Sequence, residues 1–236
     1  MSTTRLFTGS TAVMARRAPV SSCSTEGLDD FPTPPWATRA LCEYGLPKIG
    51  VTLAHAHVHE SACNRGQMAE ALREYARDVT AADVHDYGYG EVSDFLDTTF
   101  EPYDGGPDWI ITNPPFNAAD RFVTRGLSVA RRGVAVLCRT AWLEGKGRYG
   151  TLFGPNPPDM VAVFVERVPM RRGMLSATIA TATSYAWFVW HKTSYPRTTP
   201  PIIAWIPPCR TSLTREGDYV FPTERADNEQ GKGEAT

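Results

Sequence analysis

Short apolar runs along the chain alternate with amphipathic stretches, which is the pattern of a mixed α/β protein. The apolar runs have the length of buried strands, and the amphipathic stretches have the spacing of helices that cover a sheet. This order predicts one α/β domain with a mostly parallel sheet and helices on both faces. The expected strands are Val51 to Glu60, Val79 to Asp83, Asp108 to Thr112, Gly133 to Cys138, Met160 to Val168 and Ser184 to Trp190. Ile202 to Ile206 could add an edge segment. The expected helices are Ala37 to Tyr44, Met68 to Arg77 and Asn117 to Arg131.

The run that begins at Asp108 ends abruptly in Asn113-Pro114-Pro115-Phe116. Proline fixes its own φ and disfavours helical backbone in the residue before it, so this turn is rigid. An exocyclic amine on a planar ring is a poor nucleophile because its lone pair is delocalised. If the Asn113 side-chain oxygen and the Pro114 carbonyl accept the two amine hydrogens, the lone pair is localised, and Phe116 can stack on the ring. The structural alternative is an asparagine that caps the following helix.

The tetrapeptide Asn113-Pro114-Pro115-Phe116 resembles the catalytic motif of class I S-adenosylmethionine-dependent methyltransferases that act on amino nitrogens. That family includes DNA adenine N6-methyltransferases, RNA base methyltransferases and protein glutamine methyltransferases, and the tetrapeptide alone does not choose among them. The resemblance implies that these four residues are catalytic and that S-adenosylmethionine is the cofactor. It also implies a Rossmann-like, seven-stranded sheet with an antiparallel C-terminal hairpin.

The strand-to-helix turn that follows Glu60 is the predicted cofactor site, because such turns cradle nucleoside cofactors in α/β folds. It resembles the family motif Glu-Pro-x-Cys-Gly-x-Gly, with Glu60, Cys63 and Gly66 in register. Ser61 replaces the usual proline and Asn64 replaces the first glycine. Asparagine tolerates a positive φ better than most residues, but its side chain occupies space that the cofactor could require. Weakened binding or a lost activity is therefore an alternative at this turn.

The segment Asp29 to Trp36 precedes the first expected helix, and Thr33 is a candidate helix cap. This segment also resembles the aromatic-Pro-Thr-Pro stretch that, in amino-methyltransferases, closes over the methionine end of the cofactor. The resemblance implies that Thr33 and Pro34 contact the cofactor, and the position of the segment before Glu60 matches the permuted motif order of the family.

Two more acidic positions fit the cofactor site. Asp83 ends an expected strand 17 residues after Gly66, where an acidic residue usually binds the ribose hydroxyls, although an aspartate at a strand end is more often a turn former. Asp94 and Phe95 resemble the third cofactor motif of the family. That resemblance implies that Asp94 accepts a hydrogen bond from the adenine amine and that Phe95 lies beside the ring.

The composition of the 236-residue chain is that of an ordinary globular protein, with 42% hydrophobic and 21% charged residues. No apolar run approaches membrane-spanning length. The cysteines are scattered and form no CxxC pair, so we expect neither a disulfide framework nor a zinc site, and a cytoplasmic location. His55, His57 and His59 alternate within an expected strand, but the chemistry inferred above needs no metal, and none is expected. The cysteines are Cys23, Cys42, Cys63, Cys138 and Cys209.

Charge is distributed unevenly along the chain. The formal net charge of −2 argues against strong non-specific binding to nucleic acid. From Glu60 to Asp104 there are 11 acidic and 3 basic residues, whereas Arg131 to Arg172 has 8 basic and 3 acidic. A cationic cofactor in one half and a phosphate-bearing substrate in the other would explain this pattern, and chance surface charge explains it comparably well. Within the basic part, Arg139 to Leu152 could bind nucleic acid or hold its own loop to the core.

These observations predict a disordered tail at residues 1–28, a methyltransferase domain at 29–208 and a polar tail at 209–236. The N-terminal tail also has the composition of a transit peptide, but disorder is the commoner explanation. The expected function is S-adenosylmethionine-dependent methylation of an exocyclic amine, with adenine N6 in DNA favoured and nucleic acid as the partner. The alternatives are an RNA base or protein glutamine methyltransferase, which the short C-terminal tail favours because it leaves no separate target-recognition domain, and a catalytically impaired binding protein.

Overall fold

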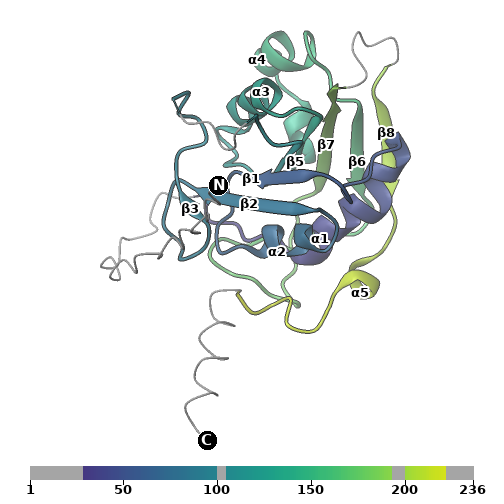
Figure 1. Ribbon diagram of the computed structural model, residues 1–236. Coiled ribbons are helices and arrows are strands. Elements are labelled where there is room, and N and C mark those ends of the chain that lie inside the picture. Colours follow the sequence, from purple (N-terminus) through teal and green to yellow (C-terminus); the bar gives the residue numbers. More distant parts are fainter. Residues whose placement is uncertain (1–28, 100–104, 193–199, 222–236) are drawn as a thin grey trace, which may run out of the picture.

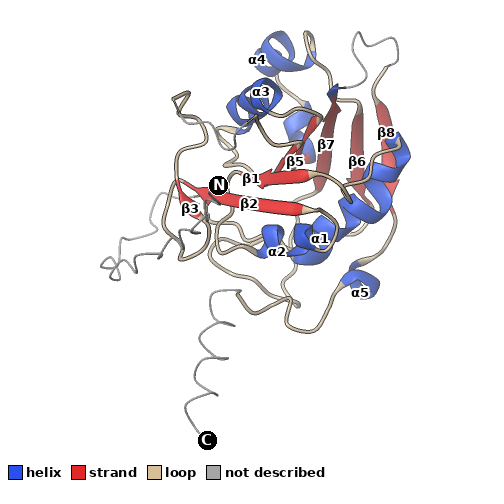
Figure 2. Ribbon diagram, in the orientation of Figure 1, coloured by secondary structure: helices blue, strands red, loops and turns tan. Residues whose placement is uncertain are grey.

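The computed structural model describes residues 29–99, 105–192 and 200–221. These residues form an eight-stranded sheet with the order β3-β2-β1-β4-β5-β7-β6-β8, and helices lie on both of its faces (Figures 1 and 2). All strands run in one direction except β7, which is antiparallel to both β5 and β6. The strands are β1 His57–Glu60, β2 Asp78–Asp83, β3 Glu91–Val92, β4 Trp109–Thr112, β5 Gly133–Arg139, β6 Met160–Phe164, β7 Tyr185–His191 and β8 Ile202–Ile206.

The helices are short. The α-helices are α1 Pro35–Ala40, α2 Gln67–Arg73, α3 Ala119–Val129, α4 Lys146–Arg148 and α5 Arg210–Leu213, and the π and 3-10 helices are η1 Leu41–Gly45, η2 Leu46–Ile49, η3 Thr140–Leu143 and η4 Tyr149–Phe153. In Figure 1, α1 and α2 lie on one side of the sheet and α3 and α4 lie on the other.

The α/β class, the mostly parallel sheet and the antiparallel pairing of β6 with β7 are confirmed. The predicted number of seven strands is one too few for the described residues, because the two-residue strand β3, which pairs in parallel with β2, was not predicted. The possible edge segment at Ile202 to Ile206 is β8, which pairs in parallel with β6. The first predicted strand is also too long. Residues 51–56 are not part of a strand, and a turn at residues 53–56 is closed by Ala56 N–H, which donates to the carbonyl of Leu53, so β1 begins only at His57.

Two apolar cores lie on opposite faces of the sheet, because successive side chains of a strand point to opposite sides. In β4, Trp109 and Ile111 belong to the core beneath α1 and α2, whereas Ile110 belongs to the core beneath α3. In β7, Trp187 and Phe188 divide in the same way. These residues are fully buried, so the sheet is a rigid base for the turns at its carboxyl edge.

Helix α1 begins with a proline in its first turn, which is the position where a missing N–H costs nothing. The predicted cap at Thr33 is wrong. The N-cap residue is Pro34, which has no polar side-chain atom with which to cap the helix, and the Thr33 hydroxyl is hydrogen-bonded to the side chain of Asn113. The helical segment continues through η1 and η2 and ends at Gly50. The φ of Gly50 is 67°, a left-handed conformation that glycine adopts without steric strain.

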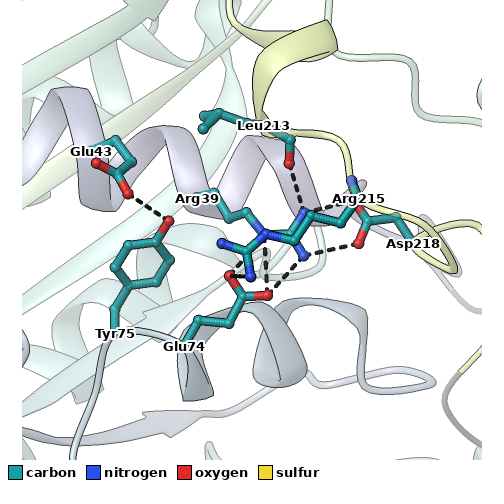
Figure 3. Close-up of polar contacts among 7 residues, drawn as sticks. All are labelled: Arg39, Glu43, Glu74, Tyr75, Leu213, Arg215 and Asp218. Carbon is teal, nitrogen blue, oxygen red and sulfur yellow. Dashed lines mark hydrogen bonds and ion pairs between the residues drawn. The ribbon is translucent and has the colours of Figure 1, made fainter.

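The predicted polar tail at 209–236 is wrong for residues 209–221, which pack against the domain. Cys209 is buried, and Asp218 is buried beside Arg39 of α1. Figure 3 shows this network, in which the Arg39 guanidinium lies between Asp218 and Glu74, and Arg215 also pairs with Glu74. The sequence suggested a tail because the segment is polar, but Asp218 and Arg215 form ion pairs with Arg39 and Glu74 of the domain. Residues 1–28 and 222–236 lie outside the described residues.

None of the helices in the described part of the chain has the length and apolar character needed to span a bilayer. Cys42, Cys63, Cys138 and Cys209 are free thiols, and Cys23 lies outside the described residues.

Candidate active site

A cavity of about 350 Å³ opens at the carboxyl ends of β1, β2 and β4. These strands are parallel, so their last residues meet at one edge of the sheet. The strand order reverses between β1 and β4, and ligands of open α/β sheets bind at such a switch point. The cavity is lined by Asp29, Phe31, Thr33, Glu60, Ser61, Ala62, Cys63, Asn64, Gln67, Met68, Asp83, Val84, Tyr87, Asp94, Phe95, Leu96, Asn113, Pro115, Asn117, Ala118, Arg121 and Phe122.

Most of the residues singled out from the sequence lie in this lining, although they range from Thr33 to Pro115 along the chain. Those that do are Thr33, Glu60, Cys63, Asn64, Asp83, Asp94, Phe95, Asn113 and Pro115. Those that lie outside it are Pro34, Gly66, Pro114 and Phe116. The fold therefore brings the predicted catalytic turn and the predicted cofactor turn to one cavity, in which each turn forms part of the wall.

Asn113 is held by only one end of its side-chain amide. Its Nδ2 donates to the carbonyl oxygen of Phe31 at 3.1 Å and contacts the Thr33 hydroxyl at 3.0 Å. A carbonyl can only accept, so this contact fixes which end of the amide carries the hydrogens. The Oδ1 atom of Asn113 is buried and has no hydrogen-bond partner among the described residues. An unpaired buried acceptor costs about 1–3 kcal/mol, so the site is built for a donor that a ligand brings.

The alternative role of Asn113 as a helix cap is wrong. Helix α3 has Ala118 at its N-cap and no side-chain cap bond. Two residues further along the turn, Pro115 contributes its carbonyl to a bond from Ala118 N–H. The turn thus ends the strand and starts the helix with backbone groups alone, which leaves the Asn113 amide for the cavity.

Phe116 lies beside the cavity and is covered by other side chains. Its ring centroid is 4.2 Å from the guanidinium carbon of Arg139 and 5.2 Å from the ring centroid of Phe31. Its backbone N–H donates to the carboxylate of Asp29 at 2.7 Å. Arg139 is exposed at the end of β5, and no carboxylate pairs with it among the described residues. A planar cation therefore lies against the ring that the sequence assigned to stacking on a substrate.

The predicted cofactor turn has left-handed backbone at two positions. Asn64 has a φ of 49° and is the one non-glycine residue with positive φ in the described part of the chain. Gly66, the N-cap of α2, has a φ of 91°, and a Cβ there would lie 2.5 Å from the Tyr89 ring. Asparagine was expected to tolerate this conformation at position 64, and it does. Its side chain donates to Asp30 at 2.7 Å.

Carboxylates dominate the charge of the cavity wall. Glu60 is 1% exposed, and it accepts hydrogen bonds from the Thr112 hydroxyl at 2.8 Å and from Ala62 N–H. Burial raises the pKa of Glu60 to about 8, and the charge of Asp83 adds to this effect, against the two hydrogen bonds. Burial also raises the pKa of Asp83, although Asp83 accepts backbone N–H bonds from His85 and Asn64.

Asp94 and Phe95 approach the cavity from the loop after β3. The Asp94 carboxylate accepts the N–H of Leu96 at 2.9 Å and is otherwise exposed. Phe95 is buried against Phe122 of α3, with ring centroids 5.3 Å apart. Val84, directly after β2, also lines the cavity and is 60% exposed, so an apolar surface of the cavity remains uncovered.

Several functional candidates were missed by sequence reasoning. Asp29 and Phe31 line the cavity and lie in the segment Asp29 to Trp36, from which Thr33 was predicted as a site residue. Their position in that segment is the only sequence signal for them. Ser61 Oγ and Gln67 Nε2 are buried polar atoms without partners among the described residues, and both residues line the cavity. No pattern in the sequence marks a buried polar atom as unpaired, because that depends on the packing around it.

Comparison with known proteins finds solved structures that have a similar fold. No protein-family model matches the sequence, and no curated protein matches it. Among solved structures, a candidate class I S-adenosylmethionine-dependent methyltransferase from Listeria monocytogenes superposes with a TM-score of 0.51 at 11% identity, over 82% of this chain and 69% of that one. A candidate RNA methyltransferase from Pyrococcus horikoshii superposes with a TM-score of 0.50 at 15% identity, over 72% of this chain and 88% of that one.

The chain has a class I methyltransferase fold. At these identities the likeness concerns the fold. The cavity described above occupies the switch point of this methyltransferase sheet, which is where α/β folds bind their ligands.

The histidines of β1 lie on one side of the methyltransferase sheet, as predicted for His57 and His59, but His55 precedes the strand. Both buried imidazoles contact the hydroxyl of Thr80, at 3.0 and 2.9 Å. Burial lowers the pKa of both rings, and that of His59 to about 4. Among the described residues, no cluster of three or more His, Cys, Asp or Glu side chains could hold a metal ion.

The basic residues between Arg131 and Arg172 divide between internal contacts and exposed positions. Arg131 pairs with Asp108 at 3.0 Å, and Arg148 pairs with Asp120 at 2.8 Å. Trp142 is buried against Phe188 and other aromatic rings, so this loop is held to the core, which was one of the two predicted roles. Arg139 remains exposed beside the predicted catalytic turn, and Arg121 lines the cavity.

Proposed function

We propose that the protein transfers a methyl group from S-adenosylmethionine to an exocyclic amino group, and that adenine N6 in DNA is the preferred acceptor. The observation that carries this proposal is the unpaired Oδ1 of Asn113, which lies at a cavity of a class I methyltransferase fold. This oxygen can accept one hydrogen of an amine and direct the nitrogen lone pair. Because the amide is already held by Phe31 and Thr33, it needs no reorganisation when the amine arrives.

The residues present fit the cofactor. A cavity of about 350 Å³ is within the usual range for small-molecule sites, roughly 300–1,000 Å³. Three aspartates and one arginine line it, namely Asp29, Asp83, Asp94 and Arg121, and this balance favours a positively charged ligand. Glu60 also lines the cavity and adds a negative charge when it ionises. We assign Asp83 to the ribose hydroxyls, Asp94 and Phe95 to the adenine ring, and Thr33 to the methionine end. The bound cofactor supplies a methyl group on a positively charged sulfur.

The unpaired atoms of the cavity wall support the same assignment. Ser61 Oγ and Gln67 Nε2 lie on the cofactor side, whereas Asn113 Oδ1 lies at the catalytic turn. Buried polar groups are normally hydrogen-bonded, so three such atoms around one cavity indicate a polar ligand that reaches both walls. The Asn64 side chain, which was a possible obstruction, is bonded to Asp30.

A nucleic acid substrate is supported by the groups beside Asn113. A base that is stacked in a duplex cannot reach this oxygen, so it would have to leave the stack. Phe116 offers an aromatic ring for it, and Arg139, which now covers that ring, can pair with a phosphate when the base displaces it. An RNA base methyltransferase is the second candidate, since one structure with this fold is described as an RNA methyltransferase. A protein glutamine methyltransferase and an impaired binding protein are the remaining outcomes.

The test has two stages. Calorimetric titration with S-adenosylmethionine and S-adenosylhomocysteine establishes whether the cofactor binds. Transfer of labelled methyl groups is then measured on single-stranded DNA, duplex DNA, RNA and protein, with the product identified by mass spectrometry. We expect N6-methyladenine in DNA. Methylated RNA or methylglutamine would move the assignment to an alternative, and a chain that binds no cofactor would contradict the enzyme proposal altogether.

The affinity for S-adenosylmethionine should depend on pH through Glu60. Its raised pKa of about 8 means that this carboxyl is mostly protonated at neutral pH in the free protein. A cationic ligand favours the ionised form, so binding releases a proton. We therefore expect the association constant to rise with pH between 6 and 8, by up to about tenfold per pH unit. Calorimetry in buffers of different ionisation enthalpy counts the released protons.

Glu60→Gln is the matched control for this dependence, because it keeps the shape and a hydrogen-bond acceptor but cannot titrate. The slope should disappear in that variant. An association constant that does not change with pH in the wild-type protein would show that Glu60 does not change its ionisation state when the cofactor binds.

A further inference from the structure

Residues 29–33 join the two walls of the cavity. Asp29 accepts the backbone N–H of Phe116, and the carbonyl of Phe31 and the hydroxyl of Thr33 hold the Asn113 amide. All three contacts are to the catalytic turn. Between them, Asp30 makes its contacts to the other wall, the cofactor turn.

The backbone explains this division. Phe31 N–H donates to the carbonyl of Asp29 at 3.0 Å, which closes a three-residue turn with Asp30 at its centre. The side chain at the centre of such a turn points away from its two neighbours. Asp30 therefore reaches Asn64 and Arg65, while the flanking residues face the catalytic turn.

The contact made by Asp30 is specific and buried. Its side chain is 2% exposed; Oδ1 accepts from Asn64 Nδ2 at 2.7 Å and from the Arg65 guanidinium at 3.0 Å. The guanidinium in turn lies over the rings of Tyr87 and Phe221, 5.0 and 4.9 Å from their centroids. A buried carboxylate is tolerated only with such partners, so the position of Asp30 is tied to that of Arg65.

Neither Asp30 nor Arg65 lines the cavity, whereas Asn64 on one side and Asn113 on the other do. We propose that Asp30 is a positioning residue, which orients the Asn113 amide through residues 31–33 and couples it to the cofactor turn. This inference rests on the proposed function for the identity of the ligand. Coupling between two sites is reciprocal, so a ligand on the cofactor turn should change the environment of Asn113, and the loss of Asp30 should weaken ligand binding.

The first test observes Asn113 directly in the free protein. The side-chain NH₂ signals of Asn113 in a ¹⁵N-correlated NMR spectrum are identified by their loss in Asn113→Asp. In the wild-type protein, hydrogen bonds to Phe31 and Thr33 should separate these signals from those of free amides. Asp30→Ala should move them toward free-amide positions, as should Thr33→Ala, which removes one of the two partners directly. Asp78→Ala breaks the exposed pair with Arg77 and is the control that should leave them in place.

The second test adds S-adenosylhomocysteine. We expect it to shift the Asn113 signals of the wild-type protein but not those of Asp30→Ala, and to bind that variant about 5- to 30-fold more weakly, within the usual range of coupling. If Asp30→Ala does not fold, Asp30→Asn keeps the hydrogen-bond acceptor, removes only the charge, and should give a smaller change in the same direction. Asp30→Glu, which restores the charge, should recover part of the affinity.

The outcomes separate this inference from the proposed function. If the wild-type protein binds no S-adenosylhomocysteine, the proposed function fails, and the comparison of free proteins still tests the role of Asp30. If ligand binds but the Asn113 signals of Asp30→Ala are unchanged while its melting temperature falls, Asp30 is only a structural clamp and the inference is overturned.

Discussion

Asn113→Ala should lose methyl transfer by about 10²- to 10³-fold in kcat, which is the usual effect of removing one preorganised polar group from a site where charge develops. The physical reason is that, under the proposed function, the buried and unpaired Oδ1 accepts a hydrogen of the amine. The affinity for S-adenosylmethionine should change by less than about tenfold, or 1.4 kcal/mol, because the cofactor groups are assigned to other residues. The measurement is single-turnover methyl transfer at saturating cofactor, together with calorimetry.

Asn156→Ala is the control, since it truncates an asparagine that does not line the cavity. It should keep the wild-type rate. Asn113→Asp gives a second comparison, because it retains both the shape and an acceptor oxygen but loses the hydrogens that hold the amide to Phe31. A rate for Asn113→Ala within a few-fold of wild type would remove Asn113 from the proposed mechanism.

Arg39→Met should destabilise the protein by about 3–5 kcal/mol, the usual cost of removing one partner of a buried ion pair. The side chains of Arg39 and Asp218 are 4% and 5% exposed, and their closest atoms are 2.6 Å apart. Burial alone would lower the pKa of Arg39. The hydrogen bonds to Asp218 and Glu74 outweigh this effect, so the pKa of Arg39 lies above its ordinary value. Methionine keeps most of the apolar stem but leaves Asp218 charged and buried. Urea denaturation, analysed by linear extrapolation, measures the loss.

The matched control is Arg77→Met, which breaks the ion pair between Arg77 and Asp78. The side chains of these two residues are 54% and 55% exposed. Pairs of this kind contribute about 0–1 kcal/mol. Arg39→Met combined with Asp218→Leu should recover part of the stability, because no unpaired charge is left. A loss below about 1 kcal/mol in Arg39→Met would mean that the Asp218 pair does not hold residues 209–221 to the domain.

The strands and helices were largely predictable because the period of the apolar pattern follows from which face of each element is buried. The predicted boundaries failed where local chemistry overrode that pattern. Val51 and Leu53 are buried like strand residues, yet they lie outside any strand. Residues 209–221 look like a tail because they are polar, and the partner that makes them part of the domain is Arg39, far away in the sequence.

The site was predictable where a turn has its own sequence signature. Asn113 with its prolines and Gly66 after its strand have local geometry that their neighbours dictate. The contacts of Asp29 and Asp30 were not predictable, because nothing local distinguishes an aspartate that binds a distant N–H group from one that faces water. Which atom of Asn113 is paired also depends on Phe31 and Thr33, which the fold brings to it.

The edge strand β8 exposes Ile203 and Trp205, at 60% and 62%, next to backbone groups that no described strand pairs. Such an edge is a template on which another chain could add a strand and start aggregation. Prolines stand on both sides of it, at Pro200, Pro201, Pro207 and Pro208. Proline has no N–H to donate to a ladder, so the pairing surface cannot extend beyond the 5 residues of β8. The flanking prolines thus limit the pairing of this edge with another chain through the backbone, while the apolar side chains of β8 stay exposed.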